Sequence, residues 1–226
     1  MSHHQRLRAA LASACLASVL AFDVTAQQRP SGGLFPPQDL GRIESPDRDQ
    51  WNKPDLIMDL VQIAEGDVVA EIGAGGGWFT IRLARRVGPG GKVYAEDIQP
   101  LMIEAISGKA RREGLDNVQT VLGTTEDPRL PEPVDAALIV DAYREVENPV
   151  ALLRNVAQSL KSQGRIAIVE FNAGGGGPGP EAEERVSPAV ILAAAEDAGL
   201  QLLAREPIPP FLFLLVFGKM SPVPIP

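Results

Sequence analysis

Short apolar runs that predict β-strands alternate along this chain with longer runs that predict helices. The expected strands are 68–72, 92–96, 118–122, 134–140 and 165–170. The helices expected before and between them are 54–63, 78–87, 100–113 and 149–160. Strands separated by single helices form right-handed crossovers, so this alternation predicts a parallel sheet with helices on both faces.

The last part of the chain departs from this alternation. A helix is expected at 189–198 and two further strands at 200–205 and 211–217. Only residues 206–210 join these two strands, and a parallel crossover needs a dozen residues or more, so the strands must be antiparallel neighbours. The sequence therefore predicts an α/β fold: a Rossmann-like, doubly wound sheet of seven strands, mostly parallel, with an antiparallel C-terminal hairpin.

The N-terminus has the three-part order of an export signal. Two arginines in the first eight residues precede fourteen uncharged residues, 9–22, and small residues stand at 24–26. The uncharged run is too short for a comfortable membrane span, and it lacks the polar face of the alternative, a frayed amphipathic helix. We expect residues 1–26 to be a signal peptide cleaved near Ala26, and the protein to be periplasmic or secreted with no stable membrane span.

Histidine and cysteine positions narrow the possible chemistry. His3, His4 and Cys15 are the only such residues of the 226, and all three lie in the expected signal. Without residues 1–26 the chain has no imidazole and no thiol. This excludes a Ser-His-Asp or Cys-His nucleophile, a disulfide, and imidazole or thiolate metal ligands, so no metal site is expected.

The net negative charge of the chain limits the classes of molecule that it is expected to bind. The formal net charge is −8, and loss of the signal removes two basic residues and one acidic residue, which gives −9. Such a surface repels phosphate backbones, so nucleic acid is not an expected partner.

Two stretches rich in glycine and proline are expected to lack regular structure: an extended lead-in at 27–50 and a mobile loop at 173–180.

The expected strand 68–72 runs into a glycine-rich turn that opens a helix at Trp78. Glycines stand at 73, 75, 76 and 77, and Glu71 lies near the strand end. A dinucleotide fingerprint would need glycine at 78, and a P-loop would need Gly-Lys-Ser/Thr. A carboxylate beside exposed backbone suits a cationic or amino-bearing ligand better than a pyrophosphate. The alternative is a plain connection between a strand and a helix.

Polar residues also follow the next three strands. Asp97 follows the second strand, Thr124 and Thr125 follow the third, and Asp141 follows the fourth. Open α/β sheets bind ligands at the carboxyl ends of their strands, where a carboxylate such as Asp97 can accept both hydroxyls of a ribose. The sequence therefore predicts one cleft at this edge.

Three ordered motifs, at 71–77, 93–100 and 134–143, resemble those of class I S-adenosylmethionine-dependent methyltransferases, and the final hairpin resembles the last two strands of that family. The resemblance implies a methyltransferase domain at 51–220 with S-adenosylmethionine as cofactor. The site residues that it implies all lie at strand ends or turns. They are Glu71 and the backbone of Gly73, Gly75 and Gly77 for the methionine part, Asp97 for the ribose, Ile98, Thr124 and Thr125 for the adenine, and Asp141 beside the methionine part and the donor methyl.

Two positions depart from the pattern of the family. Similar sequences often have histidine where this chain has Arg144, and aspartate where it has Thr124. If the acceptor is a hydroxyl, Asp141 and Tyr143 are the candidates for catalytic proton acceptance. Three further residues could shape the site or have ordinary surface and core roles: Glu170, Arg185 and Trp51.

The function that the resemblance implies is methyl transfer from S-adenosylmethionine to an unidentified small-molecule acceptor. In-line displacement at a sulfonium needs positioning and electrostatics more than covalent help from the protein, which suits a chain without histidine or cysteine. The alternative is a non-catalytic exported ligand-binding protein on the same scaffold, because export would separate the chain from a cofactor that is made in the cytoplasm.

Overall fold

The computed structural model describes residues 33–43, 45–174 and 176–220. The expected signal peptide, the first residues of the lead-in and Gly175 in the glycine-rich loop lie outside these ranges. Among the residues that are described, no helix is long and apolar enough to cross a membrane.

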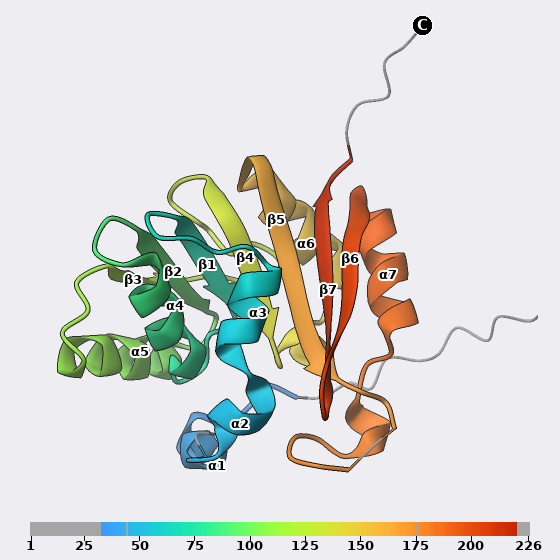
Figure 1. Ribbon diagram of the computed structural model, residues 1–226, viewed down its shortest axis with the longest axis horizontal. Coiled ribbons are helices and arrows are strands. Elements are labelled where there is room, and N and C mark those ends of the chain that lie inside the picture. Colours follow the sequence, from blue (N-terminus) through green and yellow to red (C-terminus); the bar gives the residue numbers. More distant parts are fainter. Residues whose placement is uncertain (1–32, 44, 175, 221–226) are drawn as a thin grey trace, which may run out of the picture.

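Seven strands form one sheet in the order β3-β2-β1-β4-β5-β7-β6 (Figure 1). Their bounds are β1 Val68–Ile72, β2 Lys92–Asp97, β3 Val118–Leu122, β4 Val134–Val140, β5 Leu160–Phe171, β6 Leu200–Ile208 and β7 Leu212–Lys219. The first five strands pair in parallel, and β7 is antiparallel to both of its neighbours, β5 and β6. The predicted fold class is therefore confirmed, including the C-terminal hairpin.

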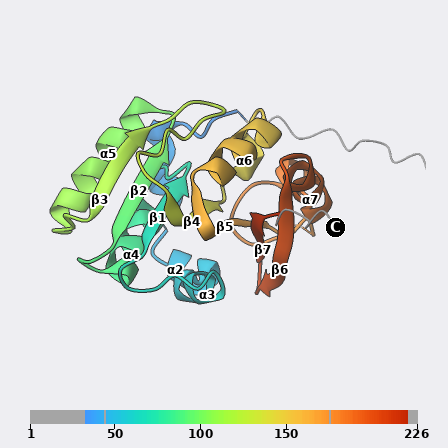
Figure 2. The same ribbon diagram turned by 90° about the horizontal axis from the view of Figure 1, so that it is seen from above.

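Helices cover both faces of the sheet. They are α3 Pro54–Leu60, α4 Trp78–Val87, α5 Pro100–Arg112, α6 Pro149–Gln158 and α7 Pro188–Asp197. One apolar cluster joins α3 and α4 to the sheet, and another joins α6 and α7 to it. Figure 2 shows α6 on the opposite side of the sheet from α3 and α4. Proline occupies the first turn of four of these helices, where its missing N–H leaves no hydrogen bond unmade.

The lead-in differs from its prediction. Residues 37–43 and 48–52 are helical rather than extended: they form a 3-10 turn η1 (Pro37–Asp39) and the short helices α1 (Leu40–Ile43) and α2 (Arg48–Asn52). Figure 1 shows α1 and α2 below the sheet. Tertiary contacts hold α2 in place, because the carboxylate of Asp49 accepts hydrogen bonds of 2.7 Å from Nε and Nη2 of Arg82 in α4.

The glycine-rich loop after β5 is packed against aromatic rings. A Cβ added to Gly177 would lie 2.5 Å from the ring of Phe211, and one added to Gly179 would lie 2.4 Å from the ring of Phe171. Arg185 donates hydrogen bonds of 2.9–3.0 Å to three carbonyl groups of the loop. These glycines therefore serve close packing, which the expectation of a mobile loop did not include.

Candidate functional site

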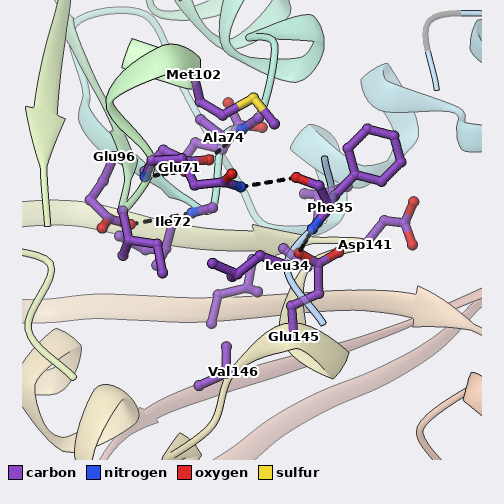
Figure 3. Close-up of a pocket in the computed structure, with 18 of the residues that line it drawn as sticks. Leu34, Phe35, Glu71, Ile72, Ala74, Glu96, Met102, Asp141, Glu145 and Val146 are labelled. Atoms are coloured by element: carbon purple, nitrogen blue, oxygen red, sulfur yellow. Dashed lines mark hydrogen bonds between the residues drawn. The ribbon is translucent and has the colours of Figure 1, made fainter. Parts of the chain in front are cut away.

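A cavity opens at the carboxyl edge of the sheet, where the strand order reverses between β1 and β4 (Figure 3). It holds about 1160 Å³ of empty space, its open mouth included. Such a reversal point is the usual ligand site of an open α/β sheet. Eight of the predicted site residues line this one cavity: Glu71, Gly73, Gly75, Asp97, Ile98, Thr124, Thr125 and Asp141.

The glycine turn after β1 supplies bare backbone to the cavity wall. Gly73, Gly75 and Gly77 have φ angles of 71°, 55° and 77°, a region that side chains rarely adopt. A Cβ added to Gly75 would meet no atom within 4 Å, so the turn leaves open space there. Gly77 was predicted to contact the ligand, but it does not line the cavity. A Cβ there would lie 3.3 Å from Ile106 of α5. Its absent side chain serves helix packing.

Glu71 near the end of β1 is a buried carboxyl group whose pKa lies near neutral pH. It is 3% exposed and accepts a hydrogen bond from the hydroxyl of Thr80. Burial raises the pKa of Glu71 to about 7, against the opposing effects of the Thr80 hydrogen bond and the positive charge of Arg48. A cationic group on a ligand would favour the carboxylate form.

Asp97 at the end of β2 is held in place by the backbone. Its Oδ2 accepts the N–H of Gly75 at 2.9 Å, and its Oδ1 accepts the N–H of Gln99 at 2.9 Å. Burial raises the pKa of Asp97, and these hydrogen bonds oppose the rise. Each carboxylate oxygen has a second lone pair, which can accept a hydroxyl of a ribose.

Thr124 is only partly available to a ligand. Its hydroxyl oxygen accepts the N–H of Asp127 at 2.9 Å and lies 3.2 Å from the carbonyl oxygen of the same residue. The hydroxyl therefore closes the turn after β3 and keeps one further lone pair that could accept a hydrogen bond.

Glu96 is a cavity residue that the sequence reasoning missed. It is 2% exposed, and its Oε2 accepts the N–H of Gly73 at 3.2 Å. A Cβ added to Gly123 would lie 1.8 Å from its Oε1, so the glycine after β3 makes room for this carboxyl group. Burial raises the pKa of Glu96 to about 8, and the group is therefore mostly protonated at neutral pH. A second carboxylate next to Asp97 at the carboxyl end of β2 was the available signal.

Asp141 at the end of β4 is strained and paired. Its φ is 55°, a value that residues with a side chain adopt uncommonly. Residues with such backbone angles are found more often at functional sites than elsewhere. Arg144 donates to its Oδ1 at 2.7 Å and to Oε1 of Glu145 at 3.0 Å. Burial raises the pKa of Asp141, and the positive charge of Arg144 opposes this. The predicted position beside the cavity is thus occupied by an ion pair.

Tyr143 is a second correction. It is fully buried in the apolar cluster of α6 and α7 and does not line the cavity. The 3-10 turn η2 (Tyr143–Glu145) places this ring in the core and Arg144 on the cavity wall. The backbone N–H of Tyr143 donates to Oε1 of Glu170 at 2.8 Å. Tyr143 is therefore wrongly placed to accept a proton from a ligand.

The remaining candidates also have structural roles. Glu170 is buried and does not line the cavity, and Arg185 holds the glycine-rich loop. Trp51 packs on Phe171 with ring centroids 5.6 Å apart, as a core tryptophan does. The part of the chain that the structure describes contains no cluster of three or more acidic, histidine or cysteine side chains that could hold a metal ion.

The lead-in supplies cavity residues that no sequence pattern indicated. Leu34, Phe35 and Arg48 line the wall. The N–H of Phe35 donates to Oε2 of Glu145 at 2.9 Å, and its carbonyl oxygen accepts from Nε2 of Gln99 at 3.0 Å (Figure 3). This backbone clamp joins the loop after β2 to the loop after β4 across the cavity.

Comparison with known proteins gives a consistent assignment. A family model described as a methyltransferase domain matches residues 63–196, more than half of the chain. The solved structure of a SAM-dependent methyltransferase from Aquifex aeolicus is 25% identical, with a TM-score of 0.76 over 81% of this chain and 98% of that chain.

Two curated relatives match a shorter stretch. The ubiquinone/menaquinone biosynthesis C-methyltransferase UbiE of Pasteurella multocida (strain Pm70) is 31% identical over 54% of this chain and 46% of its own length. The nocamycin O-methyltransferase of Saccharothrix syringae is 31% identical over 50% of this chain and 40% of its own length. This chain thus spans less than half the length of these relatives. The family match, the sheet order and the cavity together place the chain in the class I S-adenosylmethionine-dependent methyltransferase family.

Proposed function

We propose that the chain transfers a methyl group from S-adenosylmethionine to a small-molecule acceptor. The observation that carries this proposal is the gathering of Glu71, Gly75, Asp97 and Asp141 around one cavity at the reversal point of the sheet. Two curated relatives are named as C- and O-methyltransferases of small molecules, which supports an acceptor of this class.

The residues present fit the cofactor that the family uses. Glu71 faces the cavity as a partner for the ammonium of the methionine part, and Gly75 lets the ligand approach the backbone. Asp97 has lone pairs for the ribose hydroxyls, and Ile98 offers an apolar surface to the adenine. When bound, the cofactor supplies a methyl group on a positively charged sulfur, which is the electrophile of the reaction.

The contribution of the protein is positioning and electrostatics. Carboxylates on the cavity wall favour a cationic ligand, and the clamp at Phe35 forms part of that wall. Asp141 and Tyr143 were the two predicted proton acceptors. Because Tyr143 is buried in the core, Asp141 is the one that can reach a ligand in the cavity. Its ion pair with Arg144 favours the ionised form, which is the form that can accept a proton.

Calorimetric titration of the chain with S-adenosylmethionine and S-adenosylhomocysteine tests the proposal. Micromolar binding of both ligands, followed by transfer of a deuterated methyl group to a member of a quinone and phenol panel, is the expected result. Absence of binding to either ligand would favour the alternative of a ligand-binding protein on the same scaffold. We further propose export of the chain, on the charged, apolar and small-residue order of residues 1–26.

A further inference from the structure

Glu170 is a buried carboxyl group near the cavity that the proposed function does not use. It is the penultimate residue of β5, is 1% exposed and does not line the cavity. The carbonyl oxygen of its neighbour Val169 accepts the N–H of Asp141 at 2.9 Å, so the end of β5 lies beside the end of β4. A buried carboxyl group is costly unless hydrogen bonds or nearby charges compensate for its burial.

The turn η2 after β4 needs a hydrogen-bond acceptor from outside the turn. The first bond within it runs from the N–H of Glu145 to the carbonyl oxygen of Ala142 at 3.1 Å. The N–H of Tyr143 precedes this bond, and Ala142 has no side-chain oxygen that could accept it. Oε1 of Glu170 accepts this N–H at 2.8 Å. Glu170 therefore caps the turn from the neighbouring strand, as a serine or aspartate before a helix would do.

The orientation of this turn decides which side chain lies on the cavity wall. Tyr143 places its ring in the core, and the next residue, Arg144, lines the cavity. Arg144 donates hydrogen bonds to Asp141, to Oδ1 at 2.7 Å and to the carbonyl oxygen at 2.8 Å. Asp141 has a φ of 55°, and such a backbone persists only where surrounding contacts fix it. The capped turn supplies one of these contacts through Arg144.

The charges around Glu170 agree with a role for an uncharged group. Burial, together with the negative charge of Asp141, raises the pKa of Glu170 to about 8, although the positive charge of Arg144 opposes this rise. Glu170 is then mostly protonated at neutral pH, and Asp141 keeps Arg144 as its ion-pair partner. Glutamine has an uncharged acceptor oxygen of the same reach and can replace a protonated glutamate in this bond.

Resting on the proposed function, we infer that Glu170 is a positioning residue, which holds the turn after β4 so that Arg144 pairs with Asp141 on the cavity wall. Asp141 is the proposed proton acceptor of the reaction. Glu170 itself does not contact the ligand, because it does not line the cavity. Loss of the cap would displace the turn and with it this part of the wall.

The test is calorimetry of the full chain with S-adenosylhomocysteine at pH 7. Glu170→Leu removes the acceptor and keeps an apolar side chain of similar size. We expect its affinity to fall at least about tenfold, because the buried N–H of Tyr143 loses its partner and the turn rearranges. Glu170→Gln keeps an acceptor oxygen and should bind as tightly as the wild type.

A double-mutant cycle with Arg144→Gln separates positioning from a general structural role. If Glu170 acts through Arg144, adding Glu170→Leu to Arg144→Gln should lower the affinity much less than Glu170→Leu does alone. Losses that add in full would overturn the inference.

Leu215→Ala is the control for destabilisation of the core. Leu215 is fully buried in β7, in the same apolar cluster as Tyr143, and does not line the cavity. This variant should lose thermal stability and keep wild-type affinity.

Three further results would overturn the inference while the wild type still binds and the proposed function stands. They are unchanged affinity in Glu170→Leu, an equal loss in Glu170→Gln, and an equal loss in Leu215→Ala. Wild-type protein that does not bind S-adenosylhomocysteine would overturn the proposed function and this inference together.

Discussion

Asp97 presents its carboxylate to the cavity while two backbone N–H groups hold it in place. We predict that Asp97→Asn weakens S-adenosylhomocysteine binding at least about tenfold, because an amide replaces one charged acceptor by a donor. The melting temperature should also fall, since the N–H of Gly75 or Gln99 loses its acceptor. Calorimetry and a thermal scan measure both effects, with the exposed Asp116→Asn as control. Unchanged affinity would show that the Asp97 carboxylate does not bind the cofactor.

Glu71 makes cofactor affinity depend on pH. Its pKa is raised from 4.5 to about 7 in the free protein, and an ammonium partner requires the carboxylate form. Binding must therefore release a proton below pH 7, so we predict that affinity falls by up to about tenfold per pH unit as the pH drops from 7 to 5. Above pH 8 this group should add no further dependence. Calorimetric titrations between pH 5 and pH 8 on the wild type and Glu71→Gln measure this dependence of affinity on pH. If Glu71→Gln keeps the same dependence as the wild type, another group causes it.

The residues around the cavity show what strand ends can and cannot reveal. Asp97 and Asp141 could be predicted because parallel strands bring their carboxyl ends to one edge, whereas Ile98 was implied only by the resemblance to the family. Tyr143 and Arg144 could not be told apart, because the 3-10 turn after β4 decides which side chain enters the core. Adjacent residues in such a turn face different directions, and no hydrophobic period identifies them.

The clamp at Phe35 is the element that we expect to affect how fast a ligand leaves the cavity. Its two hydrogen bonds, to Glu145 and from Gln99, hold the lead-in against the wall of the cavity. We predict that Gln99→Ala speeds release of S-adenosylhomocysteine about threefold to tenfold, the effect of one net hydrogen bond. Stopped-flow displacement measures the release rate, and Gln119→Ala on the exposed face of β3 is the control. Equal release rates in the two variants would show that the lead-in does not limit exit.

The helices show why the lead-in escaped prediction. Helices α4, α5 and α6 each have ten residues or more, enough for their apolar positions to repeat. Helix α2 has five residues and no period, and its contacts are with residues some thirty positions away, such as Arg82. The sequence around residue 50 is rich in proline and charge, which favours an extended prediction when tertiary contacts are unknown.

The compartment in which the whole protein resides determines whether the cavity has access to S-adenosylmethionine. We predict that protein from the envelope fraction has the mass of a chain that begins near Gln27, because residues 1–26 have the order of a signal peptide. Intact-mass spectrometry of that fraction measures it. A full-length species confined to the soluble cytoplasmic fraction would contradict export and would place the chain with the cytoplasmic supply of the cofactor.

A matched pair of glycine variants tests whether the cavity at the glycine turn after β1 binds S-adenosylmethionine. Gly75 and Gly114 have φ angles of 55° and 66°, and a Cβ at either meets no atom within 4 Å, but only Gly75 lines the cavity. The measurement is S-adenosylhomocysteine affinity, by calorimetry, in Gly75→Val and Gly114→Val. Both variants should lose stability through backbone strain. We predict that Gly75→Val alone loses binding, and equal binding by the two variants would show that the cofactor does not bind at this turn.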